Sequence, residues 1–124
     1  MQQRILILDF GSQYTQLIAR RVRELNVYSE IVPYNKIPEI DDTIAGIILS
    51  GSPFSVTDKH ALHPDMERLI GSKPVLAVCY GAQYVAQHFG GKVMRSDKRE
   101  YGKALLTNIQ PDPLFEGVSE AQVW

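Results

Sequence analysis

The sequence predicts an α/β fold in which helices cover both faces of a mostly parallel sheet. Three short apolar runs carry this prediction, namely Ile5–Leu8, Gly46–Leu49 and Pro74–Val78. Unbroken apolar runs of this length are typical of strands that are buried on both faces. Segments with helical periodicity lie between them, and strands that alternate with helices indicate a parallel sheet with crossover connections.

The first apolar run leads into a tight polar corner at Asp9–Ser12 and then into a predicted helix over Tyr14–Leu25. Ser12 is expected to cap this helix, and Asn26 is expected to end it. A second strand is predicted at Val27–Val32. The apolar side chains of the helix are expected to share one buried face, and they are Leu17, Ile18, Val22 and Leu25.

The second half of the pattern begins with the strand Gly46–Leu49, which ends in the turn Ser50–Pro53. A short helix is predicted at Asp65–Ile70, after Pro64 at its start. The apolar run Pro74–Val78 then leads through Cys79 into a predicted helix that Gly90 and Gly91 close.

After Gly91 the pattern changes to short strands joined by turns. Lys92–Met94 and Tyr101–Thr107 are predicted as strands that the charged turn Arg95–Glu100 connects. A further strand is expected to begin at Gln122, two residues before the chain stops. We therefore expect the chain to be the first part of a longer domain.

Cys79 is the only cysteine of the chain, and it lies where a predicted strand turns sharply into a helix. Such a corner accepts only small residues two places before and two places after its apex, and Ala77 and Gly81 satisfy this requirement. The pattern is that of a nucleophile elbow with a thiol in place of a hydroxyl. The N-terminus of the following helix favours the reactive thiolate. A buried, inert cysteine is the alternative interpretation.

Right-handed crossovers would bring the carboxyl ends of these strands to one edge of the sheet, where ligands bind in open α/β folds. Cys79 and the Ser50–Pro53 turn can therefore meet at one site. A thiol that attacks a carbonyl group needs N–H donors for the developing oxyanion. Tyr80, which follows the nucleophile, would supply one, and the turn that contains Gly51 would supply the other. An ordinary turn after a strand is the alternative.

Other polar residues carry weaker signals. Gln83 lies one helical turn after Cys79, where it could bind a polar substrate group or simply face solvent. The Asp9–Ser12 corner is expected to cap its helix rather than to bind a ligand. His88 would lie more than ~10 Å along the helix axis from the sulfur, too far for a general base. His60 and His63 are expected to face solvent, so the chain offers a nucleophile without its base.

Composition limits the class of protein. The chain has 124 residues, of which 44% are hydrophobic and 22% charged, as expected for one ordinary globular domain. A net charge of −1 gives no field that favours nucleic acid or an anionic membrane. A single cysteine excludes an internal disulfide and fits a reducing compartment. No signal peptide or membrane-spanning run is visible, so we expect a cytoplasmic protein.

Five stretches of the chain carry a resemblance to a known family. The chain is similar to the N-terminal part of the class I, or triad-type, glutamine amidotransferase domain, and within that class to the GMP synthase family. The resemblance runs from Arg4 to Trp124. Its longest stretch reads Ile-Leu-Ile-Leu-Asp-Phe-Gly-Ser-Gln-Tyr-Thr-Gln at 5–16, and the others are Arg20–Glu24, Ile47–Gly51, Val78–Gln83 and Arg99–Gly102.

The resemblance implies a flavodoxin-like, three-layer α/β/α fold that is incomplete at its C-terminal end. It also implies that Cys79 attacks the side-chain amide of glutamine, releases ammonia and forms a glutamyl thioester that water hydrolyses. Backbone N–H groups of Ser52 and Tyr80 would form the oxyanion hole. Gly51 and Gln83 would help to hold glutamine.

The partners that the resemblance implies are glutamine and an ATP-pyrophosphatase (synthetase) domain, in the same chain or as a separate subunit. That domain would use Mg-ATP to aminate xanthosine monophosphate to GMP. No metal or cofactor is implied in residues 1–124. These residues would stop before the catalytic histidine and glutamate, so the fragment alone is expected to hydrolyse glutamine very poorly.

The chain departs from the family pattern at one site position, where Ser52 replaces the second glycine of Gly-Gly-Pro. A serine keeps the backbone donor, but a left-handed φ at this position would cost roughly 1–2 kcal/mol. We expect the serine to be tolerated.

Three other functions stay open at this point. The chain could belong to another class I amidotransferase, or to a cysteine-dependent hydrolase or deglycase with a similar elbow. Those hydrolases usually have histidine directly after the cysteine, where this chain has Tyr80. A non-catalytic, flavodoxin-like binding module is the third, although Asp9–Ser12 lacks the Ser-, Thr- and Gly-rich pattern that holds phosphate.

Overall fold

The computed structural model describes residues 3–52, 69, 71, 73–93, 104–106, 112–117 and 121–123. They fall into two compact units, Met1–Val93 and Met94–Trp124, and each unit is described by itself. Of the predicted helix Asp65–Ile70, only Leu69 lies inside the described residues, where it is helical and fully buried. The predicted turn Arg95–Glu100 lies outside them.

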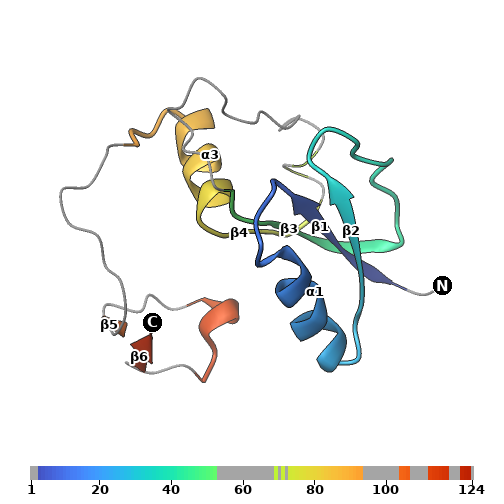
Figure 1. The fold of residues 1–124 in the computed structure, drawn as a ribbon, viewed down its shortest axis with the longest axis horizontal. Helices are drawn as coiled ribbons and strands as arrows, with labels where there is room; N and C mark the ends of the chain where they lie inside the picture. The colour runs from blue at the N-terminus through green and yellow to red at the C-terminus, as the bar shows by residue number, and fades with distance from the viewer. Residues whose placement is uncertain are drawn as a thin grey trace. The chain divides into compact units, whose positions relative to one another are not determined.

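The first unit is built on a four-stranded sheet in the order β2-β1-β3-β4 (Figure 1). All three strand pairs are parallel, which confirms the predicted parallel sheet. This order begins the 2-1-3-4-5 arrangement of flavodoxin-like sheets. The strands are β1 (Arg4–Asp9), β2 (Tyr28–Pro33), β3 (Ile44–Leu49) and β4 (Val75–Ala77).

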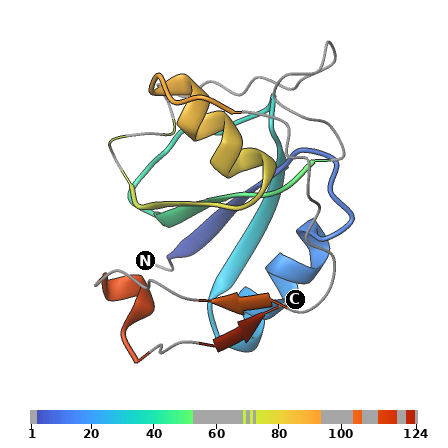
Figure 2. The same cartoon turned by 90° about the vertical axis from the view of Figure 1, so that its left-hand side faces the viewer.

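Two helices cover opposite faces of this sheet, α1 (Thr15–Glu24) and α3 (Tyr80–His88) (Figure 2). Leu6 and Leu8 of β1 belong to the apolar core that α3 covers. Because side chains alternate along a strand, Ile7 points to the other face and is fully buried beneath α1. The unit therefore has the three layers that the sequence predicted.

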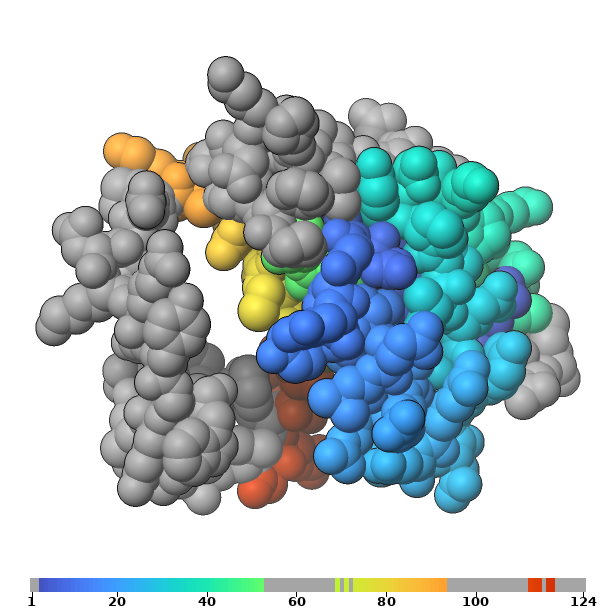
Figure 3. All heavy atoms as spheres, viewed as in Figure 1, coloured from blue at the N-terminus to red at the C-terminus, as the bar shows by residue number. Residues whose placement is uncertain are grey.

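The buried face of α1 differs from the prediction. Of the four predicted residues, Ile18 and Val22 are half-buried, whereas Leu17 and Leu25 are 43% and 76% exposed; the fully buried positions are Thr15 and Ala19. The helix backbone lies so close to the sheet that the Ser29 hydroxyl donates directly to the Ala19 carbonyl, at 3.1 Å. Only small side chains fit between a helix and a sheet that lie this close, so the larger leucines lie at the edge of the contact. Figure 3 shows the solvent side of this helix.

The two ends of α1 are close to the prediction. Asn26 follows the helix with φ 62°, in the left-handed region that terminates helices. Ser12 does not occupy the cap position itself, which belongs to Tyr14. The Ser12 hydroxyl instead accepts a hydrogen bond from the N–H of Tyr14, the cap residue itself, at 3.0 Å.

The apolar run before Cys79 is less buried than predicted. Leu76 is 41% exposed and Val78 is 36% exposed. Among the described residues β4 pairs only with β3, so it forms an edge of the described sheet. An apolar run predicts a strand, but not which place the strand takes in the sheet.

The second unit contains an antiparallel pair, β5 (Ala104–Leu106) and β6 (Ala121–Val123), and a 3₁₀ turn, η1 (Pro113–Phe115). Strands were predicted at both places. The predicted strand Lys92–Met94 is wrong for Lys92 and Val93, which are in no strand; Met94 lies outside the described residues. An extended segment forms a strand only when it pairs with a neighbouring segment. The partner of β5 is β6, so β5 does not pair with Lys92 and Val93.

No helix within the described part of the chain has the length and apolar character needed to cross a membrane.

Candidate functional site

Cys79 occupies the corner between β4 and α3 in a strained backbone conformation, with φ 50° and ψ −111°. Among the described residues other than glycine, only Asn26 shares a positive φ. Such conformations cost of order 1–3 kcal/mol and are found mainly at functional sites. The free thiol is exposed, so the alternative of a buried, inert cysteine does not apply.

The corner is held by backbone contacts with the end of β3. The Val78 N–H donates to the Leu49 carbonyl at 2.9 Å, and the Gly81 N–H donates to the Val78 carbonyl at 3.0 Å. A Cβ at Gly81 would lie 2.6 Å from the Leu49 Cβ and 2.8 Å from the Leu49 oxygen. Glycine is therefore required two residues after the thiol, as the elbow pattern predicted.

Tyr80 anchors the residue after the thiol in the core. Its side chain is 2% exposed, and its ring centroid lies 5.4 Å from that of Phe10 and 6.4 Å from that of Tyr84. Phe10 in turn stacks on Tyr34 at 5.7 Å. Burial raises the pKa of Tyr84 above its ordinary value. This row of rings fixes the first turn of α3, and with it the backbone beneath the sulfur.

A pocket of about 410 Å³ opens beside the thiol, where β1, β3 and β4 end. It lies at the β1/β3 switch point, where flavodoxin-like sheets bind ligands. Three of the predicted site residues meet in it: Gly51, Ser52 and Cys79. The described residues that line it are Gly11, Ser12, Gln13, Tyr14, Gly51, Ser52 and Cys79.

Gly51 keeps this pocket open because it has no side chain. A Cβ at Gly51 would lie 3.5 Å from the Cys79 Cβ and 3.7 Å from the Ser12 Oγ. The glycine at position 51 suggested an unusual backbone conformation for this turn. Neither Gly51 nor Ser52 has a positive φ, so the backbone of the turn is ordinary in this respect. The left-handed strain considered for Ser52 is absent, and serine fits this position without that cost.

Gln83 is not among the residues that line the pocket. It lies on α3 one turn after the thiol, its side chain is exposed, and its N–H donates to the Cys79 carbonyl at 3.0 Å. His88 is the last residue of α3 and packs edge-on against Phe89, at 5.0 Å between ring centroids. His60 and His63 lie outside the described residues.

The loop after β1 lies at the edge of the sheet where ligands were expected to bind, but a capping role was predicted for it rather than contact with a ligand. We expected Asp9–Ser12 to cap α1, and it does form local turns: Asp9 accepts from the Gly11 N–H at 2.8 Å. Yet Gly11, Ser12, Gln13 and Tyr14 also line the pocket. The available signal was the position of this loop at the carboxyl end of the strand next to β3.

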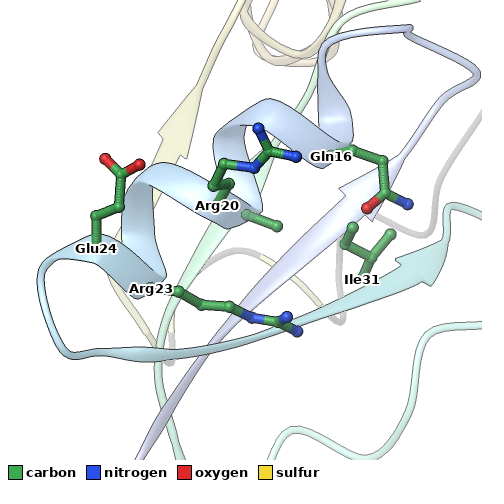
Figure 4. A pocket seen from close by; sticks show the side chains of 6 residues that line it. Gln16, Arg20, Arg23, Glu24 and Ile31 are labelled. Atoms are coloured by element: carbon green, nitrogen blue, oxygen red, sulfur yellow. The ribbon is translucent and has the colours of Figure 1, made fainter.

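A second pocket lies along α1 and does not include the thiol (Figure 4). Its two arginines come from α1, and Arg23 is engaged with β2, donating to the Ser29 hydroxyl at 3.2 Å and to the Ser29 carbonyl at 3.1 Å. None of the described residues that line this pocket is a cysteine, serine, threonine or histidine. Its lining residues are Gln16, Ala19, Arg20, Arg23, Glu24 and Ile31.

Comparison with known proteins identifies the relatives of this chain. The family model "Glutamine amidotransferase class-I" matches residues 6–124. Proteins named GMP synthase [glutamine-hydrolyzing] match the whole chain, at 63% identity in Christiangramia forsetii and 58% in Bacteroides fragilis. The chain spans about a quarter of the length of these relatives.

A solved structure has the same fold. It is the crystal structure of a protein from Thermoplasma acidophilum that is provisionally described as one subunit of a GMP synthase. The TM-score is 0.76 with 29% sequence identity, over 100% of this chain and 64% of that one. The three-layer fold of the first unit is therefore that of a known group of proteins.

The packing at Gly81 yields a prediction about stability. Gly81→Ala is expected to lower the free energy of unfolding by roughly 1–3 kcal/mol, because the new methyl group must displace β3. Urea unfolding measures the change. Gly46→Ala is the matched control, since its Cβ would be in ordinary contact, 3.4 Å from Ile5 Cδ1. Equal stability of the two variants would contradict the close packing described here.

Proposed function

The chain belongs to the class I glutamine amidotransferase family, and we propose that it forms the first part of the glutaminase domain of a GMP synthase. Residues 1–124 would then stop before the histidine and glutamate of the triad. The proposal rests on the matches to the family and to the GMP synthases, together with a thiol that sits exposed at a strained elbow.

The chemistry would proceed through a thioester. The Cys79 sulfur attacks the side-chain amide carbon of glutamine, and the carbonyl oxygen becomes an oxyanion. The C–N bond then breaks and ammonia leaves with a proton delivered to its nitrogen. Water adds to the γ-glutamyl thioester and the C–S bond breaks, giving glutamate and restoring the thiol.

The oxyanion would be held by two backbone N–H groups, one from Ser52 and one from Tyr80. Donors of this kind, fixed before the reaction, are worth roughly 3 kcal/mol each. Tyr80 is the first residue of α3, at the positive end of the helix dipole. Ser52 lines the pocket together with Cys79. This meeting of two distant segments supports an oxyanion hole at the pocket.

The remaining site residues would bind glutamine. Gly51 would let the substrate approach the sulfur closely, since its missing side chain leaves open the space between Cys79 and Ser12. Gln83 is offered as a second binding residue, because its exposed side chain lies one turn from the thiol.

The ammonia would be consumed by a synthetase domain that uses Mg-ATP to convert xanthosine monophosphate to GMP. The length of the relatives supports a domain on the same chain, whereas the Thermoplasma protein, which is described as one subunit of its enzyme, supports the alternative of two chains. A nucleophilic cysteine must stay reduced, which favours a reducing compartment such as the cytoplasm.

A cysteine-dependent hydrolase of similar fold is the second candidate. The buried Tyr80 ring directly after Cys79 disfavours it, because those enzymes usually have histidine there. A reagent that resembles glutamine separates the two candidates.

We predict that a diazo-ketone analogue of glutamine labels Cys79 in the complete enzyme, and that excess glutamine slows the labelling. Peptide mass analysis locates the modification, and its rate is compared with that of free cysteine. A thiol that reacts no faster than free cysteine and gains no protection from glutamine would refute a glutaminase.

Replacing the nucleophile should separate the two activities of the complete enzyme. Cys79→Ala is expected to lower glutamine-dependent GMP formation by about a thousandfold or more, since the thioester can no longer form. Activity with added ammonium is expected to stay near that of the wild type. Loss of both activities would mean that Cys79 does not act in ammonia release alone.

The proposal also predicts what the gene encodes after Trp124. Within about the length of the remaining domain we expect a histidine followed two positions later by a glutamate, which would act as the base and its orienting partner. DNA sequencing of the gene checks this directly. A gene that encodes no such pair would remove the general base from the mechanism.

A further inference from the structure

Two buried hydroxyl groups lie directly behind the pocket. Thr15 is the first residue of α1 and Ser50 follows β3, and both side chains are buried. The Thr15 Oγ1 and the Ser50 Oγ are 3.2 Å apart. Buried polar groups are kept where their hydrogen bonds are satisfied, so this pair needs the contacts that surround it.

The direction of these hydrogen bonds follows from counting protons. The Ser50 hydroxyl lies 2.7 Å from the Leu8 carbonyl oxygen, which can only accept. Since a hydroxyl has one proton, Ser50 donates to Leu8 and must accept from Thr15. The Asp9 carboxylate, which accepts from the Gly11 N–H, lies 3.4 Å from the Thr15 Oγ1 and is a second, longer acceptor for the same Thr15 proton.

This chain of hydroxyls connects three segments that border the pocket. Leu8 and Asp9 are at the end of β1, Thr15 begins α1, and Ser50 directly precedes Gly51. The Ser50 N–H makes a further hydrogen bond between two of these segments, because it also donates to the Leu8 carbonyl, at 3.3 Å. Ser50, the residue directly before Gly51, is therefore held through both its side chain and its N–H.

We propose that Thr15 and Ser50 are positioning residues for the oxyanion hole, because their hydroxyls hold the Gly51–Ser52 segment against Cys79. This inference rests on the proposed glutaminase function. Neither hydroxyl lines the pocket, so neither touches the substrate. They act through the backbone N–H that follows, whose placement matters most when the oxygen becomes anionic.

Removing either hydroxyl breaks the chain in the same way. Without the Ser50 hydroxyl, Thr15 keeps only the Asp9 carboxylate, at 3.4 Å, and the Leu8 carbonyl keeps only the Ser50 N–H, at 3.3 Å. Both remaining hydrogen bonds are long, and weakly bonded buried polar groups are unfavourable, so the segment is expected to shift until these bonds shorten. Misplacing a catalytic donor by about 1 Å can lower a rate by up to about a hundredfold.

The test is steady-state glutaminase kinetics on the complete enzyme. Ser50→Ala and Thr15→Val are each expected to lower kcat for glutamine about tenfold or more, with KM changed less than about threefold. The double variant should be no slower than the slower single one, because both belong to one chain of bonds. Thr15→Ser, which keeps the hydroxyl, should restore most of kcat.

Ser29→Ala is the matched control. Ser29 is also a fully buried serine that bonds to α1, but at the middle of the helix, through the Ala19 carbonyl. The Ser29→Ala variant should lower the unfolding midpoint by about as much as Ser50→Ala does, and it should leave kcat within about twofold of the wild type. Iodoacetamide should label Cys79 at equal rates in all these variants.

The outcomes separate this inference from the proposed function. An unchanged kcat in Ser50→Ala and Thr15→Val, or an equal loss in Ser29→Ala, would overturn the positioning role while leaving the glutaminase intact. A wild-type enzyme that does not hydrolyse glutamine would overturn both. A rise in KM alone would assign the two hydroxyls to substrate binding and also overturn the inference.

Discussion

The contact between Gly81 and Leu49 is the constraint on which the rest of the site depends. It places the first turn of α3 directly against the end of β3, with no room for a side chain between them. The chain can reach this contact from β4 only through a sharp corner, and the positive φ of Cys79 is the result. The thiol is exposed because the corner turns it away from the core.

The strain at Cys79 is offset by packing that lies one residue further along. Tyr80 buries a large ring beside Phe10 and Tyr84, and burying an aromatic side chain of this size stabilises a fold by an amount comparable to the cost of the corner. On the other side of the pocket, the Gly51–Ser52 segment meets the thiol because parallel strands end at one edge of the sheet. Two separate features therefore converge on one pocket.

Local patterns in the sequence predicted the features that depend on neighbouring residues. The apolar runs predicted the parallel strands, Asn26 predicted the helix end, and Ala77 and Gly81 predicted the corner at the thiol. Periodicity also predicted that Leu17 and Leu25 would be buried, which failed because α1 approaches the sheet through small residues.

Features that depend on distant parts of the chain were not predicted from the sequence. The exposure of Leu76 depends on the place of β4 in the sheet, and the part that Gly11 and Gln13 take in the pocket depends on how β1 lies beside β3. The backbone conformation of Ser52 was not predictable either, because the identity of a residue as serine does not show whether its φ is left-handed.

The row of aromatic rings at Tyr80 has a consequence for how the protein unfolds. Loops at the rim of a fold commonly open by themselves, at a small cost, while the interior stays intact. This corner has no such freedom, because the residue next to the sulfur is part of the interior. Fraying at the Cys79 corner would require the rings of Phe10 and Tyr80 to separate, so loss of the pocket on heating and melting of the interior become a single event.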